Sequence, residues 1–155
     1  NTPTWNFEWH FTSDATETGS SNIDTFTLEL GLDYDPSPTG TNFVVFDPLA
    51  PTVDVPFWDH AFGDNSTPNG GGIVATNATE YLDNLAQLNV VQQSWAYHWF
   101  DVFSTFDANE AGVYDIYLKV FIYGNEIAES YISVSVGGAV ANENSSWSDI
   151  KTLYR

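Results

Sequence analysis

Apolar and polar residues alternate along two stretches near the start of this chain. The first stretch carries an aromatic residue at every second position: Trp5, Phe7, Trp9 and Phe11. The second stretch, residues 25–34, alternates apolar side chains with polar residues and one glycine. Successive side chains of a strand point to opposite faces, so this period of two predicts a strand with one buried face in each stretch.

Later parts of the chain predict four more strands. They cover residues 42–46, 94–103, 113–122 and 126–136. Residues 94–103 carry apolar side chains on both faces, so we expect a central strand there that is buried on one face and partly covered on the other. The last two strands are predicted to form a hairpin across residues 123–125, whereas two prolines confine any strand in residues 49–58 to a sheet edge.

One internal segment has the spacing of a helix. Asn77 followed three residues later by Glu80 is a capping pair, and leucines recur at helical intervals after it. We therefore predict a short crossover helix over residues 78–88, packed on the sheets.

The last residues of the chain also predict a short helix. Ser146 is placed to cap it, and its apolar face holds Trp147, Ile150 and either Leu153 or Tyr154. Lys151 and Arg155 fall near its C-terminal end, where the helix dipole favours cations. This tail either docks back on its own domain or attaches the chain to a partner.

Short strands separated by turns about every ten residues are typical of a β-sandwich. The turn-rich stretches are residues 35–40, 63–72 and 107–112. At 155 residues the chain is long enough for one domain with a buried core. We predict an all-β, Ig-like or Greek-key sandwich over residues 1–138, with the loop 63–72 separating its two halves and the tail 139–155 after it.

The charge of the chain narrows the choice of partners. It has 21 acidic residues and three basic ones, which gives a net charge of −18. Nucleic acids and anionic membrane surfaces bind Lys and Arg, so neither is an expected partner. Divalent cations, basic proteins and neutral glycans remain. No apolar run approaches the roughly 20 residues of a membrane-spanning helix.

Cysteine and methionine are both absent. Without cysteine the chain has no disulfide, no thiolate nucleophile and no Cys-ligated metal site. The absence of methionine favours secretion, because methionine is prone to oxidation outside the cell. No basic and then apolar leader opens the chain, so Asn1 is expected to start a processed form. We therefore expect an extracellular, cell-surface or periplasmic location.

Residues 111–138 read AGVYDIYLKVFIYGNEIAESYISVSVGG, with a Gly-x-Tyr entry, a Gly-Asn turn and an Ile-x-Val-x-Val final strand. This stretch resembles the last hairpin of bacterial Ig-like, PKD-like and fibronectin-like modules. Residues 145–155, SSWSDIKTLYR, resemble a tail that follows such modules in exported bacterial surface proteins. The two stretches cover about a quarter of the chain. The resemblance implies an exported, non-catalytic module, and it carries over no catalytic residue.

Two turn-rich loops could supply oxygen ligands for a calcium ion. The candidate ligands are Asp33 and Asp35 in one loop, and Asp107, Asn109 and Glu110 in the other. Ca²⁺ takes six to eight oxygens from carboxylates, amides and carbonyls. The alternative is that these side chains accept hydrogen bonds from the backbone of their own turns, as Asp and Asn commonly do.

Catalytic patterns are missing from the sequence. The three histidines, His10, His60 and His98, have no metal-binding spacing, and each lies in a different predicted strand or loop. No G-x-S-x-G motif and no phosphate-binding glycine loop occurs. We therefore expect a protein without enzymatic activity.

The leading prediction is a structural or assembly subunit outside the cytoplasm that contacts other protein subunits. The residues expected at those contacts are Trp5, Phe7, Trp9, Phe11, Trp58, Trp147, Ile150 and Tyr154. One physical route is strand addition at the first strand, because an open sheet edge accepts a strand from a neighbour. The alternative prediction is a calcium-assisted carbohydrate-binding module, which would use exposed tryptophans beside acidic loops.

Overall fold

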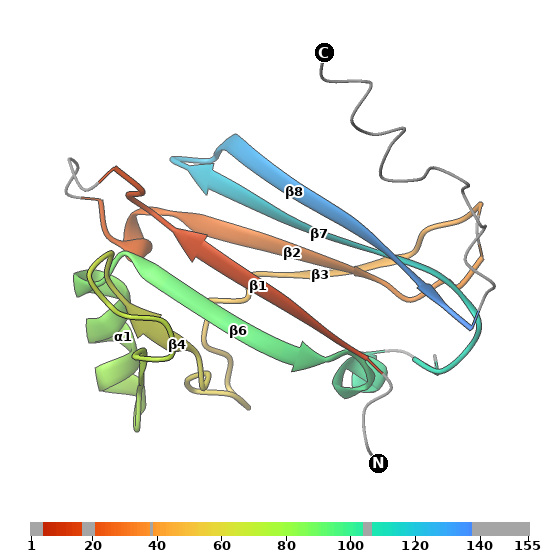
Figure 1. Cartoon of the computed structure of the whole chain (residues 1–155), viewed down its shortest axis with the longest axis horizontal. Helices are drawn as coiled ribbons and strands as arrows, with labels where there is room; N and C mark the ends of the chain where they lie inside the picture. The colour runs from red at the N-terminus through yellow and green to blue at the C-terminus, as the bar shows by residue number, and fades with distance from the viewer. Residues whose placement is uncertain (1–4, 17–20, 38, 104–106, 138–155) are drawn as a thin grey trace, which may run out of the picture.

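The computed structural model describes residues 5–16, 21–37, 39–103 and 107–137. They form two antiparallel four-stranded sheets that pack face to face, so the predicted all-β sandwich is confirmed (Figure 1). Sheet A has the strand order β1 (Asn6–Thr12), β6 (Val90–Ala96), β4 (Ala61–Gly63), β5 (Ile73–Val74). Sheet B has the order β3 (Phe43–Phe46), β2 (Thr27–Asp33), β7 (Gly112–Ile122), β8 (Asn125–Val136).

The core lies between the two sheets and is rich in aromatic rings. On β1 the alternation predicted from the sequence is confirmed, because Phe7, Trp9 and Phe11 are all buried. On β2 the leucines at 28, 30 and 32 are buried in the same way. Burying large rings at every second position fixes the register of β1, since a slip by one residue would turn all of them to solvent.

One α-helix, α1 (Ala78–Gln87), lies within one residue of the predicted span. The Asn77 side chain accepts a hydrogen bond from the Glu80 N–H at 3.0 Å, as a cap should. The Glu80 carboxylate accepts the N–H of Thr76 at 2.8 Å, one residue earlier than in a standard capping box. The helix joins β5 to β6, which lie on either side of β4, so it is a crossover within sheet A.

The strand predicted over residues 94–103 is wrong in its second half. Strand β6 ends at Ala96, and the chain continues as a 3-10 helix, η2 (Tyr97–Phe103). A 3-10 helix has three residues per turn, so Tyr97 and Phe100 lie on the same side, and both are buried. This spacing gives apolar residues on both parities, which is also the pattern of a central strand that is buried on one face and partly covered on the other.

The loop over residues 63–72 does not separate the two halves of the sandwich. It connects β4 to β5, which pair with each other in sheet A. The predicted hairpin of β7 and β8 is confirmed, and Tyr123 and Gly124 at its turn have φ angles of 51° and 78°. Positive φ at both central residues is what a two-residue hairpin turn requires.

A second 3-10 turn, η1 (Ile23–Thr25), precedes β2 and packs beside α1. Residues 49–58, where the sequence allowed an edge strand, contain no strand. The helix predicted for the tail lies outside the described residues. In the described part of the chain, no helix reaches the length and apolarity needed to cross a membrane.

Candidate functional site

Strand β1 is the last described strand of sheet A, and β8 is the last strand of sheet B on the same side of the sandwich (Figure 1). Between them lies a groove of about 250 Å³, which we call the edge groove. Residues that border it include Glu8 and Trp9 on β1, Leu118 on β7, and Ser130 and Ile132 on β8. Trp9 is buried, and its indole nitrogen has no hydrogen-bond partner among the described residues.

The exposure of two paired isoleucines shows that β8 is uncovered. Ile116 on β7 and Ile132 on β8 are directly opposite each other in the sheet and therefore share its inward face. Ile116 is 4% exposed and Ile132 is 46% exposed. The difference arises because, within the described residues, sheet A has no strand beyond β1 to cover β8.

The backbone of β1 is also open on this side. Strand β1 pairs with β6 along its whole length and with no other described strand. In an antiparallel strand every second residue directs its N–H and C=O to one side. Half of the β1 backbone groups therefore face the edge groove, where another strand could pair with them.

The aromatic side chains of β1 belong to the domain's own core. Phe7, Trp9 and Phe11 are buried there. Trp5 stacks on Tyr97 with ring centroids 4.2 Å apart, and its Nε1 donates a hydrogen bond to the Ala108 carbonyl at 2.9 Å. If β1 contacts a partner, the contact is made mainly by its backbone edge and by outward residues such as Glu8.

The other residues predicted at partner contacts fall elsewhere. Trp58 is half-buried, packs 5.6 Å from Trp95 between ring centroids, and donates a hydrogen bond to the Ala50 carbonyl. Trp58 therefore packs against the edge of the core, and its ring is not an exposed flat surface on which a sugar could stack. Trp147, Ile150 and Tyr154 lie outside the described residues.

Ser130 and Ile132 are not among the contact residues predicted from the sequence. The available signal was the pair Tyr131-Ile132, two large side chains that point to opposite faces of one strand. A sandwich covers at most one face of its edge strand. When both faces carry a large apolar side chain, at least one of these side chains stays exposed. The sequence alone did not show that β8 is an edge strand.

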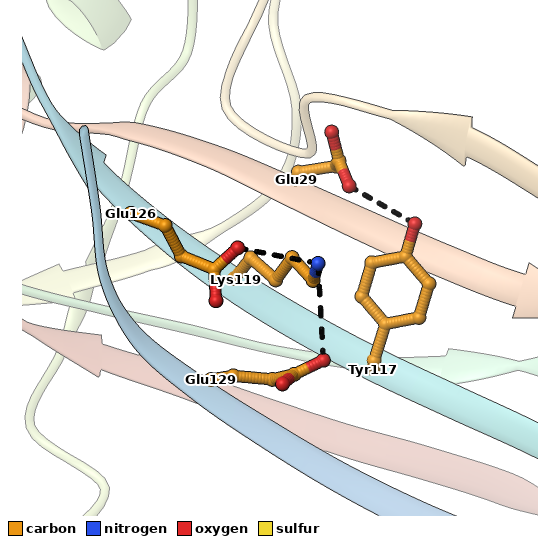
Figure 2. A network of polar contacts seen from close by, with 5 residues as sticks. All are labelled: Glu29, Tyr117, Lys119, Glu126 and Glu129. Atoms are coloured by element: carbon orange, nitrogen blue, oxygen red, sulfur yellow. Dashed lines mark hydrogen bonds and ion pairs between the residues drawn. The ribbon is translucent and has the colours of Figure 1, made fainter. Parts of the chain in front are cut away.

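The outward face of sheet B carries a polar network of its own (Figure 2). The Lys119 ammonium lies 3.2 Å from Glu126 and 4.0 Å from Glu129, and 5.4 Å from the centroid of the Tyr117 ring. The Tyr117 hydroxyl donates to Glu29 at 3.0 Å. Burial, with the hydrogen bond and the charge of Glu29, raises the pKa of Tyr117 to about 12. The polar groups on this face of β7 and β8 are thus paired within the domain, unlike the apolar inward face of β8.

A second groove, of about 540 Å³, lies on the outward face of sheet A. Its lining is mostly polar and includes Glu8, His10, Asp59, Gln92 and Gln93. The Gln93 amide donates to the Asp59 carboxylate at 2.6 Å. Glu8 borders both grooves, so it lies at the rim of the edge groove on the solvent side of β1.

The two loops with calcium-ligand candidates meet at one end of the sandwich. The Val113 N–H donates to the Pro36 carbonyl at 3.2 Å, and the Tyr97 hydroxyl donates to the Asp33 carbonyl. The Tyr114 hydroxyl donates to the Glu110 carbonyl at 3.0 Å. These contacts bring the loop with Asp33 next to the loop with Glu110.

The acidic side chains of these loops accept hydrogen bonds from their own turns. Asp33 accepts the N–H groups of Asp35 and Asn42 at 3.0 and 2.7 Å. Asp107 accepts the N–H and the side-chain amide of Asn109, which lowers the Asp107 pKa. Asp35 accepts the N–H of Ser37 at 2.9 Å. No group of three His, Asp or Glu side chains in the described part of the chain is placed to hold a metal ion.

His60 is a buried member of the core. Its Nε2 donates to the Pro48 carbonyl at 2.9 Å, and its Nδ1 lies 3.5 Å from the Gln93 amide nitrogen. Its ring packs against Trp9 and Tyr81, at 5.2 and 5.9 Å between centroids. Burial lowers the pKa of His60 to about 4, so the imidazole is neutral at physiological pH.

Comparisons with protein-family models, with curated protein sequences and with solved structures found no match for this chain.

Proposed function

We propose that this protein is a non-enzymatic structural subunit of an assembly outside the cytoplasm, and that it joins its neighbours through the edge groove. The observation that carries the proposal is the exposure of Ile132 beside its buried neighbour Ile116. An added strand beside β1 would cover the inward face of β8 and pair with the open backbone of β1. A protein–protein contact would thus complete a sandwich that the described chain leaves one strand short.

Monomeric proteins usually protect a free sheet edge with proline, lysine, a bulge or an inward-pointing charge. Strand β1, with the sequence NFEWHFT, contains no proline or lysine, and its pairing with β6 has no register shift. Strand β8 has one irregularity, opposite Val120 and Phe121 near its start. The inward face of β8 around Ile132 carries no charge. These features suit an edge that pairs with a partner.

The acidic composition and the absence of methionine support a location outside the cytoplasm. A net charge of −18 keeps unassembled subunits apart and soluble until a specific contact forms.

A charge placed on the inward face of β8 tests this function. We expect Ile132→Lys to prevent assembly, because a strand added beside β1 would bury the ammonium group without a partner. Tyr131→Lys is the matched control: Tyr131 is 52% exposed, adjacent in sequence, and paired with Tyr117 on the outward face. Particle mass is measured by light scattering over a range of protein concentrations. Circular dichroism verifies that both variants fold.

The wild-type protein and Tyr131→Lys should form particles larger than one chain, and Ile132→Lys should remain monomeric. A wild-type protein that stays monomeric at all concentrations would contradict assembly by this chain alone. If both lysine variants assemble as well as the wild type, the contact lies elsewhere on the surface.

A further inference from the structure

We infer that residues 148–155 of one copy of this chain fill the edge groove of a second copy as an added strand. The inference rests on the proposed function, because it identifies the partner at the same groove. These residues lie outside the described part of the chain.

The shape of the edge groove favours a single strand over a whole sheet. Strand β8 extends past β1 on the groove side, as the exposure of Ile132 shows. If the β1 strands of two copies paired with each other, the two β8 strands would have to occupy the same space. The occupant is therefore an extended segment that leads away from its own domain.

Charge indicates which segment of the chain this is. Residues 1–137 hold 19 of the 21 acidic residues and only Lys119 among the basic ones. Residues 138–155 hold two acidic and two basic residues, and the basic ones are Lys151 and Arg155. Glu8 is exposed at the rim of the groove. The tail therefore brings positive charge to an acidic surface. Its basic side chains would pair with acidic side chains on the neighbouring strand.

The pattern of the tail fits the two sides of the groove. With a period of two, Ile150, Thr152 and Tyr154 fall on one face of a strand. Lys151, Leu153 and Arg155 fall on the other. The first set would lie over Ile132 and Leu118, and the second would place its charges beside Glu8. Short segments of this kind satisfy both the strand and the helix period, so this pattern competes with the helix expected from the sequence.

Length and direction favour a tail from a second copy. Eight residues of strand span about 26 Å, close to the roughly 23 Å of the seven-residue β1. Strands β1 and β8 run in opposite directions (Figure 1). A tail that folded back from the end of β8 would run parallel to β1. A tail from another copy can pair antiparallel, which is the more stable arrangement per residue.

Such a contact joins two different surfaces, the tail of one copy and the edge groove of the next. It leaves each copy with one tail and one groove to offer, so it repeats along a chain of subunits or closes into a ring.

Disulfide trapping between full-length chains tests the inference, and because the chain has no native cysteine only the introduced thiols can form links. One set of chains carries His10→Cys, an exposed position on the outward face of β1. A second set carries one cysteine at each position from 148 to 155 in turn. Each pair is mixed, oxidised and separated on a non-reducing gel beside each chain oxidised alone, so that links between like chains are subtracted. The matched control replaces His10→Cys with Gln92→Cys, an exposed position opposite His10 on β6. Strand β1 separates Gln92 from the groove.

We expect covalent dimers of His10→Cys with alternate tail positions among 149, 151, 153 and 155, and at least tenfold fewer with the intervening positions or with Gln92→Cys. Alternation is the signature of a strand. Links that recur every three or four positions would show a docked helix and overturn the inference. A doubly substituted chain that links only to itself, with no dimers on mixing, would show that the tail fills its own groove and would also overturn it.

The mass of the unmodified protein separates this inference from the proposed function. If the wild-type protein assembles, Ile132→Lys blocks assembly and no tail position links to His10→Cys, another segment fills the groove and only the inference is wrong. If the wild-type protein is monomeric and no links form, both are wrong.

Discussion

The buried imidazole of His60 predicts how the stability of this domain depends on pH. His60 is 0% exposed and lies among aromatic rings, and its Nε2–H donates to the Pro48 carbonyl. In this tautomer Nδ1 can accept only, and the Gln93 amide nitrogen lies 3.5 Å from it. Adding a proton to Nδ1 would place a positive charge in the core. It would also set the new N–H of His60 against the N–H groups of the Gln93 amide.

The size of the effect follows from the two pKa values. Burial lowers the pKa of His60 from 6.5 to about 4, against the smaller opposing effects of the Pro48 hydrogen bond and the Asp59 charge. Between these values the unfolded chain binds a proton that the folded chain does not, so stability rises with pH in this window. The stabilisation is complete above pH 6.5 and is lost as the pH falls, by about 2 kcal/mol at pH 5 and about 3 kcal/mol below the folded pKa.

The assay is urea unfolding at about pH 7.5, 6 and 5 for the wild type and for His60→Phe. The phenylalanine keeps an aromatic ring but cannot bind a proton, and it leaves the Pro48 carbonyl unpaired at every pH. We expect His60→Phe to be less stable than the wild type at pH 7.5. At pH 5 the difference between their free energies of unfolding should be about 2 kcal/mol smaller. His10→Asn removes an exposed histidine and should follow the wild type.

Titration of the many carboxylates affects all three proteins alike and cancels in the difference. If the wild type and His60→Phe lose stability in parallel from pH 7.5 to pH 5, His60 does not stay neutral when the domain folds. The packing around it would then have to admit water or a counter-charge.

Two further predictions test the helix and sheet B by urea unfolding. Asn77→Ala removes the cap of α1 and should lower the free energy of unfolding by about 1 kcal/mol. Asn69→Ala, in the exposed β4–β5 loop, is the control and should change it little. Equal effects of the two substitutions would mean that the cap does not stabilise the domain. Gly31→Ala should lower the free energy of unfolding by about 1–3 kcal/mol, because the added Cβ would overlap Cε1 of the Tyr117 ring. In a Tyr117→Val background, Gly31→Ala should cost much less, because the ring that it would overlap is gone. If the two substitutions lower the free energy of unfolding additively, the overlap is not the cause.

The strands that could be predicted from the sequence have one clearly apolar face. In β1 and β2 the alternation is regular and the buried parity is unambiguous, so both strands and their inward residues are as predicted. The cap at Asn77 predicted α1 because it is a local interaction between residues three positions apart. The strand prediction is wrong after Ala96 because the aromatic residues there recur at intervals of three as well as two. No local feature distinguishes a strand from a 3-10 helix in this segment.

The edge groove could not be predicted, because it depends on which strands are neighbours. The sequence shows that β1 and β8 are strands, but not that both end their sheets on the same side of the sandwich. Chain order is a poor guide here, since the residues of β1 pair with residues of β6 that lie 78 to 90 positions later. The signal for the site is therefore the contrast between Ile116 and Ile132, which look alike in the sequence and differ only in what lies opposite them.

The two sides of the sandwich differ in the length of their edge strands. On one side the edges are β5 with two residues and β3 with four, lengths that allow few backbone hydrogen bonds to another chain. On the other side β1 has seven residues and β8 has twelve. On the outward face of the β7–β8 hairpin, Lys119 pairs with Glu126 and Glu129, whereas on its inward face Ile132 is left 46% exposed. If assembly uses the open backbone of β1 and the uncovered inward face of β8, each copy accepts a partner strand on this side alone, and growth then proceeds from one copy to the next in a fixed order.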